Sequence, residues 1–234
     1  MPRTARIVAP GLPHHITQRG NNRQDVFFVD DDRRMYLKIL AAQCRRFGTA
    51  ILGYCLMGNH VHLMAVPARA DSLAKAIGRT HWLYARYVNR MHRRSGHLWQ
   101  NRFYSSAMDE EHALLAMRYT ERNPLRAGMC RAARRYRWSS AAAHCGGGDE
   151  FELLDMKLWN KLAAGLTWEK ELAVTLSPAE LAKMRRATRT GRPLAGDSFL
   201  SKLEHVLGRR LRPLKAGRKK KIKAKRKRYA RGAK

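Results

Sequence analysis

Two histidines separated by one residue, His60 and His62, are the first residues of this sequence whose spacing could support chemistry. They open an apolar run typical of a β-strand, in which side chains two residues apart lie on the same face. Both imidazoles could therefore bind one metal ion, because imidazole binds Mn, Zn and Ni and tolerates Mg beside oxygen ligands. The alternative is two ordinary histidines at a strand edge, and such a pair taken alone favours that alternative.

Tyr119 and Asn123 lie four residues apart in the last turn of a predicted helix, which places them on one helix face. Asn123 could supply an amide oxygen as a third metal ligand, although an asparagine before a proline also commonly ends a helix. A tyrosine with apolar neighbours is more often a core residue than a nucleophile. Glu121 is two residues from Tyr119, so we expect it to face away, as a surface charge rather than a general base.

Together, these residues would suit the cleavage of a phosphodiester. A metal ion polarises the phosphate and stabilises charge in the transition state. A tyrosine can attack that phosphate, although a phenol with a pKa of ~10 is mostly protonated at neutral pH and needs help to react. The resulting phosphotyrosine conserves the energy of the bond, so the strand can be rejoined without ATP.

The charge of the chain indicates the partner. The 234 residues include 48 Lys and Arg against 18 Asp and Glu, which gives a net charge of +30. Such an excess is typical of proteins that bind a polyanion, and nucleic acid is favoured because each neutralised phosphate releases counterions. No apolar run reaches the ~18 residues of a membrane-spanning helix, and we see no secretory or lipidation signal. We therefore expect a cytoplasmic, nucleoid-associated protein without a membrane partner.

The elements that must position these residues alternate between strands and helices. The hydrophobic pattern predicts strands at 14–19, 50–57, 61–66 and 103–107, and helices at 30–47, 72–93 and 109–123. This order favours an α+β fold in which helices pack against an antiparallel sheet.

The chain divides into three predicted parts. Residues 1–145 would form the catalytic domain, and a glycine-rich acidic link then leads into a small helical extension over 146–212. Residues 213–234 are almost entirely Lys, Arg, Gly and Ala, which predicts a disordered basic tail. At this charge density we expect the tail to anchor phosphate rather than to be merely solvated.

Several stretches of the sequence resemble a known family. Two stretches, Met57–Leu63 and Tyr119–Gly128, closely resemble the signature stretches of the single-tyrosine transposases of the HUH superfamily. More narrowly, the chain resembles the REP-associated tyrosine transposases over most of residues 1–212. The further stretches that carry this resemblance are Arg6–Gly11, His15–Arg23, Trp138–Ser140 and Thr190–Leu194.

The resemblance implies a ferredoxin-like fold with a central antiparallel sheet. It implies that His60 and His62 bind Mg or Mn, and that Tyr119 forms a 5′-phosphotyrosine and releases a 3′-OH. In related insertion-sequence transposases a glutamine four residues after the tyrosine completes the metal site, whereas this chain has the shorter Asn123. The family acts on hairpin-forming single-stranded DNA, here expected to be REP-type repeats.

Several residues are candidate DNA contacts. The first strand and the loop after it contact DNA in the family, which indicates Arg19, Asn21, Asn22 and Arg23. Arg86 and Arg90 lie on a predicted helix with interleaved aromatic residues, where they could pair with phosphates while the aromatic rings stack on bases. The alternative is a helix that buries its aromatic residues and exposes its arginines. Arg102 could contact phosphate or support the neighbouring strand.

Two other functions remain open. One is a catalytically silent protein that only binds hairpin DNA or RNA, and the presence of His60, His62 and Tyr119 together argues against it. The other is a replication-initiation or relaxase-type nickase. The short chain without a helicase segment argues against that function. Both a monomer and a homodimer are compatible with the sequence: small relatives exchange the tyrosine helix within a dimer, whereas a long C-terminal extension favours a monomer.

Overall fold

A single four-stranded sheet forms the centre of the computed structural model, which describes residues 6–212. The predicted basic tail lies outside the described residues. All neighbouring strands are antiparallel, in the order β2-β3-β1-β4. The strands are β1 (His14–Arg19), β2 (Thr49–Leu56), β3 (His60–Pro67) and β4 (Tyr104–Ala107).

Helices α1 (Asp30–Phe47) and α2 (Ser72–Met91) connect β1 to β2 and β3 to β4. The resulting βαββαβ order, with β1 and β3 in the middle of the sheet, is that of a ferredoxin-like fold. The α+β class and the antiparallel sheet predicted from the sequence are thereby confirmed.

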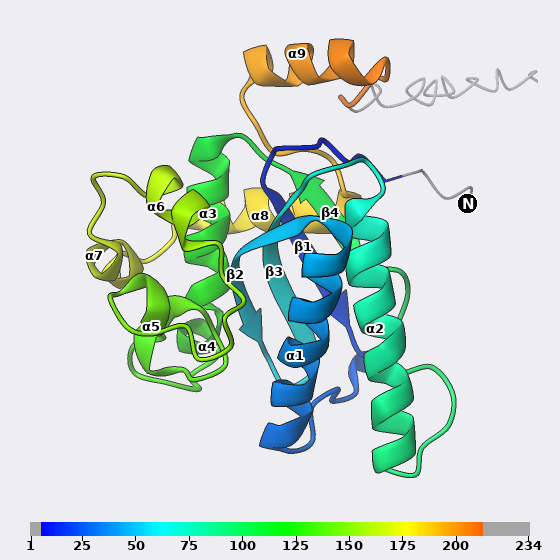
Figure 1. Ribbon diagram of the computed structural model, residues 1–234. Helices are drawn as coiled ribbons and strands as arrows, with labels where there is room; N and C mark the ends of the chain where they lie inside the picture. Colours follow the sequence, from blue (N-terminus) through cyan, green and yellow to red (C-terminus); the bar gives the residue numbers. More distant parts are fainter. Residues whose placement is uncertain (1–5, 213–234) are drawn as a thin grey trace, which may run out of the picture.

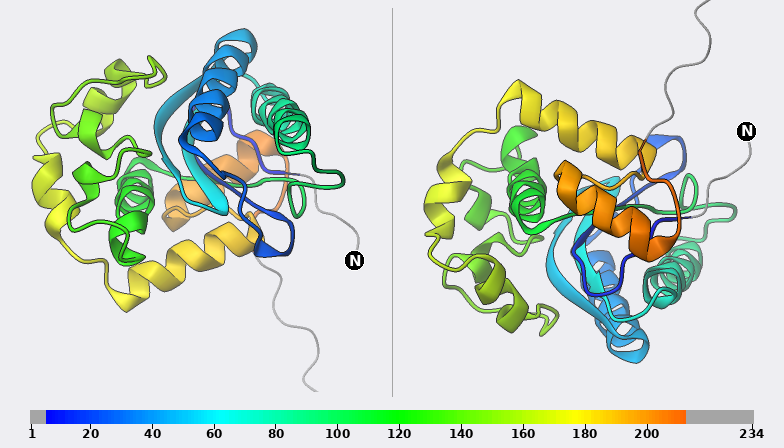
Figure 2. Two further views of the ribbon diagram at one scale, coloured as in Figure 1. Left: turned by 90° about the horizontal axis from the view of Figure 1, so that it is seen from below. Right: turned by 90° about the horizontal axis from the view of Figure 1, so that it is seen from above.

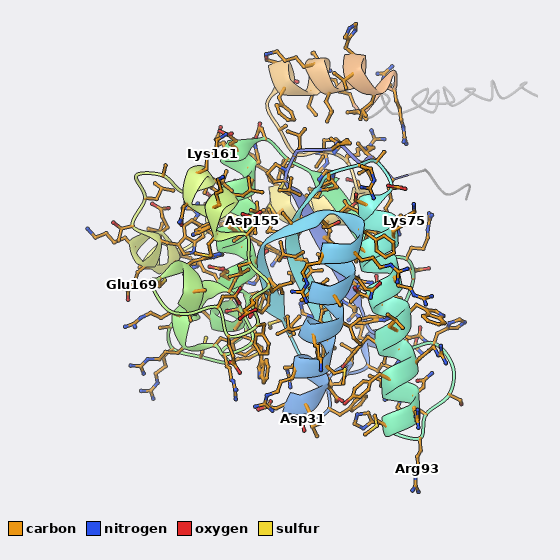
Figure 3. The ribbon with its side chains drawn as sticks, viewed as in Figure 1. Asp31, Lys75, Arg93, Asp155, Lys161 and Glu169 are labelled. Carbon is orange, nitrogen blue, oxygen red and sulfur yellow. The ribbon has the colours of Figure 1, made fainter. Side chains whose placement is uncertain are left out.

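The two connecting helices cover one face of the sheet and run in opposite directions. Asp31 in the first turn of α1 and Arg93 just after α2 lie at the same end of the molecule, while Lys75 near the start of α2 lies at the other (Figure 3). Strand alternation turns Val61 and Leu63 toward these helices, where both are fully buried. Burial of this apolar layer removes hydrocarbon from water and is the main force that holds the helices on the sheet.

Local sequence determines where α1 begins and ends. Three aspartates occupy its first turn, where the helix dipole favours negative charge. The Asp32 carboxylate accepts hydrogen bonds from the backbone N–H groups of Phe28 and Val29 at 2.8 and 3.0 Å. The helix ends at Phe47, and the next residue, Gly48, caps it with a left-handed φ of 63° that glycine readily adopts.

The opposite face of the sheet carries α3 (Glu110–Glu121), which packs with Met117 and Ala116 against Leu52 and Met64. Figure 1 and the left view of Figure 2 show α3 and the short helices from α4 to α7 on the far side of the sheet from α1 and α2. Because α3 carries Tyr119, the candidate site lies on this second face.

The C-terminal part of the chain adds to this second layer. Trp159, Trp168 and Met184 join the apolar cluster that contains Tyr119, and α8 contacts α3, β1 and β4. The last helix, α9, lies across the end of the sheet (Figure 1), with Leu203 in a small separate cluster. The bounds are α4 (Asn123–Arg126), α5 (Ala141–His144), α6 (Met156–Leu162), α7 (Trp168–Ala173), α8 (Pro178–Thr190) and α9 (Asp197–Leu207).

The observed elements differ from the predicted ones mainly after β4. The helix predicted over 109–123 is two helices, because α3 ends at Glu121 and α4 begins at Asn123 with Pro124 in its first turn. Proline lacks an N–H and so cannot continue the hydrogen bonding of a preceding helix. The short helix α5 was not predicted, whereas the extension predicted to be helical over 146–212 contains α6, α7, α8 and α9. No helix of the described residues is long and apolar enough to cross a membrane.

Candidate active site

The two histidines of β3 face the α3 side of the sheet together. Their ring centroids are 5.1 Å apart, with the ring planes at 78°. Val61 between them points into the core on the opposite face, where it is fully buried. The strand therefore turns both imidazoles toward one space, as its side-chain alternation predicts.

Each imidazole uses its Nδ1 atom in a hydrogen bond with a neighbouring side chain. His60 Nδ1 lies 2.6 Å from Asn59 Oδ1, and the Asn59 amide is itself held by a hydrogen bond from its Nδ2 to the Arg23 carbonyl. His62 Nδ1 lies 2.9 Å from Nε2 of His15 on β1. Such partners fix the orientation of a ligand imidazole. In both residues it is therefore Nε2 that is left to bind a metal ion.

Both imidazoles are held in the neutral form that a metal ion requires. Burial, reinforced by the positive charges of Arg19 and Arg126, lowers the pKa of His60 to about 4. Burial also lowers the pKa of His62 well below its usual value, with further contributions from His15 and His60. A neutral imidazole offers its lone pair without first releasing a proton. The pair fits a divalent metal at neutral pH.

Tyr119 reaches this pair from the last turn of α3. Its ring packs edge-on against His62 and His15, with centroid distances of 5.7 and 5.9 Å. The guanidinium of Arg126 lies over the ring, 4.7 Å from its centroid. The side chain is almost buried, at 7% exposure, so the phenol is held within the pocket rather than extended into solvent.

Asn123 also reaches the pair, but with its amide turned away from the arrangement that a metal ligand needs. Its Nδ2 lies 3.4 Å from His60 Nε2, while its Oδ1 accepts a hydrogen bond from Arg126 at 2.7 Å. Within residues 6–212 there is no group of three or more His, Cys, Asp or Glu side chains that could hold a metal ion. A third protein ligand would therefore have to come from a side chain of another type, such as this amide.

These residues line a pocket of about 540 Å³. Tyr119, both histidines and Asn123 form one wall, and Thr17 and Gln18 of β1 contribute nearby. The remaining walls carry four arginines, which are Arg19, Arg126, Arg185 and Arg189. The pocket thus combines a neutral imidazole pair, a phenol and concentrated positive charge, a combination suited to a phosphate group.

Three of these arginines were not predicted from the sequence. Arg126 lies in the same family-like stretch, Tyr119–Gly128, as Tyr119 and Asn123, and its spacing of three residues from Asn123 on one helix was the available signal. Arg185 and Arg189 come from α8, 66 and 70 residues after Tyr119 in the chain. Nothing in their local sequence distinguishes them from the many other arginines.

The predicted DNA contacts are divided among several places. Arg19 lines the pocket with the histidines, whereas Asn21 and Arg102 line a neighbouring cavity of about 680 Å³. Arg86 lies over the ring of the exposed Trp82 at 4.7 Å from its centroid, and it is not among the residues that line the pocket of the histidine pair. The others are exposed: Asn22 and Arg23 in the turn after β1, with left-handed φ values, and Arg90 on α2.

The expectation that Glu121 is a surface charge is wrong. Its carboxylate is fully buried and accepts hydrogen bonds from Trp168 Nε1 and His144 Nδ1, each at 2.7 Å, and from the Ser140 hydroxyl. Glu121 does face away from Tyr119 along the helix. The side of α3 that Glu121 faces is covered by the C-terminal helices. The spacing of residues within one helix does not reveal this packing.

One known family matches part of this chain. The profile of a family described as "Transposase IS200 like" matches residues 9–123, a range that contains His60, His62, Tyr119 and Asn123. No curated protein matches the sequence.

Two solved structures are similar at low sequence identity. One is a REP-associated tyrosine transposase bound to a REP hairpin, at 15% identity and a TM-score of 0.49, with 66% of this chain and 98% of that chain covered. The other is a putative transposase from Deinococcus radiodurans R1, at 18% identity and a TM-score of 0.36, with 50% of this chain and 94% of that chain covered. On the family match, the chain belongs, over residues 9–123, to the IS200-like transposases.

Proposed function

We propose that this protein cleaves and rejoins single-stranded, hairpin-forming DNA through Tyr119, with His60 and His62 holding a divalent Mg or Mn ion. The observation that carries the proposal is the contact between the Tyr119 ring and His62, at 5.7 Å between centroids, inside a pocket lined by four arginines. A phenol, two neutral imidazoles and a cationic wall are the groups that tyrosine-mediated phosphodiester exchange needs.

In this proposal Tyr119 is the nucleophile. Its hydroxyl oxygen bonds to phosphorus as the bond from phosphorus to the 3′-oxygen breaks, which leaves a 5′-phosphotyrosine and a free 3′-OH. The exchange replaces one phosphate ester by another, so the reverse attack by a 3′-OH can rejoin DNA. Arg126 stacks on the Tyr119 ring and lines the pocket, where its charge would stabilise the phosphate as it reacts.

The metal ligands in the proposal are Nε2 of His60 and Nε2 of His62, and the ion would polarise the phosphate when bound. Asn59 and His15 hold these two rings through their Nδ1 atoms. Asn123 would serve as third ligand if its amide turned over, which would bring Oδ1 beside His60 and give up the present bond from Arg126. Replacement of Asn123 by Ala should then weaken Mn binding less than replacement of His60 by Ala.

The substrate in the proposal is a hairpin with single-stranded flanks, of the REP type. The support is the overall charge of +30, the arginine-lined pocket, and the relative at a TM-score of 0.49 whose structure contains a REP hairpin. The proposed DNA contacts are the predicted ones, Arg19, Asn21, Asn22, Arg23, Arg86, Arg90 and Arg102. The protein would act as a monomer or a homodimer; within one chain Tyr119 already reaches His60 and His62.

The test is a covalent protein–DNA band. The protein is incubated with a single-stranded REP-type hairpin and Mn, and the products are separated on a denaturing gel. Tyr119→Phe should lose the band while binding the hairpin with nearly unchanged affinity. Tyr87→Phe, on the α2 side of the sheet, is the matched control and should keep it. A band that persists in Tyr119→Phe, or a wild type that binds hairpins but cleaves none with either Mg or Mn, would contradict the proposal.

A further inference from the structure

A second pocket lies next to the first one, at the β4 edge of the sheet. Its volume is about 380 Å³, and its wall includes Asn101 and Tyr104, which also line the catalytic pocket. Among the strands of residues 6–212, β4 pairs with β1 alone, and the end of its outer edge accepts a hydrogen bond from the Leu194 N–H to the Ala107 carbonyl at 2.9 Å. The two pockets are therefore neighbours that share one wall, and one extended polymer could occupy both.

Five arginines converge on this second pocket from parts of the chain that are far apart in sequence. They come from the segment before β1, the approach to β4, the link between α8 and α9, and the residues that follow α9. The right view of Figure 2 shows α9 and the link that precedes it beside the N-terminal segment. The five residues are Arg6, Arg102, Arg192, Arg209 and Arg210.

The wall of this pocket carries no acidic side chain: none of the described residues that line it is Asp or Glu. Arg102 and Arg210 are exposed and are absent from the ion pairs formed within residues 6–212. Arg6 lies against the Phe103 ring, 3.6 Å from its centroid. Burial and the nearby charge of Arg102 lower the pKa of Arg6 to about 10.

Like charges at close range repel each other, so an anion placed between these arginines would stabilise the pocket. We infer that this second pocket, which we call the arginine pocket, binds the phosphodiester backbone of the single strand that leads to or from the cleavage site. The inference rests on the proposed function and adds to it the place where the unpaired part of the substrate is held.

Tyr104 supports a single strand rather than a duplex as the occupant. Its side chain is 45% exposed and lies on the wall between the two pockets. Aromatic side chains beside a cationic groove are typical of single-strand binding, because an unpaired base can stack on the ring while the backbone follows the charge. Tyr104 is positioned to stack on a base between the reacting phosphate and the phosphates held by the arginines.

The test compares two ligands and two double variants of the full chain, by fluorescence anisotropy in EDTA so that no cleavage occurs. One ligand is a hairpin with single-stranded flanks on both sides, and the other is the same hairpin without flanks. The first variant is Arg102→Ala with Arg210→Ala. The control, Arg45→Ala with Arg46→Ala, removes the same charge from exposed arginines at the end of α1, near the opposite edge of the sheet, where Arg45 lies beside β2.

For the flanked hairpin, the arginine-pocket variant should bind on the order of tenfold more weakly than the control variant, since each charge-assisted hydrogen bond contributes appreciably to binding. The slope of log affinity against log salt should become shallower by about 1.4, at about 0.7 for each single-strand phosphate contact. For the hairpin without flanks, the two variants should bind alike.

Equal losses on both ligands would overturn the inference, because the arginines would then hold the duplex. Binding indistinguishable from that of the control variant on the flanked ligand would overturn it as well. The covalent-band assay keeps this result separate from the proposed function. A wild type that forms the covalent band while the arginine-pocket variant binds like the control refutes the inference alone. A wild type without the band but with the flank-dependent loss refutes the proposed function alone.

Discussion

Replacement of Glu121 by Ala should be among the most destabilising single changes in this protein. The carboxylate lies between α3 and the C-terminal helices, with no exposure to water. It accepts hydrogen bonds from Trp168 Nε1 and His144 Nδ1 at 2.7 Å each, and from the Ser140 hydroxyl. The substitution removes the acceptor for all three donors at once.

The expected loss follows from these contacts. A buried donor left without a partner costs ~1–3 kcal/mol. Ser140 retains a second contact, with the Tyr54 carbonyl at 3.3 Å, so the indole of Trp168 and the ring of His144 carry most of the penalty. With two donors left unpaired, we expect Glu121→Ala to lower the free energy of unfolding by about 2–6 kcal/mol. Glu121→Gln should lower it by less, because the amide retains one acceptor oxygen.

Urea unfolding followed by circular dichroism measures this difference. Glu111→Ala is the matched control, because it removes the same side chain from an exposed position in the first turn of the same helix. The free energy of unfolding of Glu111→Ala should fall by only ~0.3–1 kcal/mol, the contribution of a charge near a helix N-terminus. If the free energies of unfolding of Glu121→Ala and Glu111→Ala differ by less than ~1 kcal/mol, the buried hydrogen bonds of Glu121 do not stabilise the fold.

Acid should destabilise the fold between about pH 6.5 and 4, because burial lowers the pKa of His14 to about 4 and that of His81 to about 3. The unfolded chain takes up these protons near pH 6.5 and the folded chain does not, so the stability present above pH 6.5 falls by ~1.4 kcal/mol per pH unit for each group as the pH drops. Urea midpoints at several pH values measure this, and a His14→Gln variant with the same pH dependence as the wild type would count against it. Gly20→Ala should displace the turn at Asn21–Arg23, because a Cβ there would overlap the Gln24 carbonyl oxygen and lie 2.9 Å from Val26 Cγ1. Hairpin affinity should fall about tenfold, the cost of losing one charge-assisted contact, whereas Gly78→Ala, with nothing within 4 Å of the added Cβ, should stabilise α2; equal affinities for the two variants would refute this.

Features that depend only on a local pattern of residues were predicted well from the sequence. The apolar periodicity located all four strands and the helices α1, α2 and α3, because each buries one face against a single sheet. Strand alternation also placed His60 and His62 on one face. Residues within one element keep their relative positions whatever the rest of the chain does, so spacing alone was sufficient.

Prediction failed where a second part of the chain determines the environment. Helical spacing correctly turned Glu121 away from Tyr119, but only the packing of α5 and α7 shows that this direction is the interior. The hydrogen bond from Arg126 to Asn123 Oδ1 was likewise not predicted from the sequence, and the role of Asn123 as third metal ligand stays a prediction. The arginines of α8 reach the pocket through a packing arrangement that local sequence does not encode.

The contribution of α7 and α8 has a consequence for the order in which the protein becomes active during synthesis. The ribosome releases the histidine pair and Tyr119 well before Trp168, which binds Glu121, and before Arg185 and Arg189, which line the pocket. Domains generally fold in the order in which they emerge. A nascent or prematurely terminated chain that ends before α7 would therefore carry the proposed catalytic residues without the wall that completes their pocket. On the proposed function, translation would have to pass residue 189 before DNA could be cut.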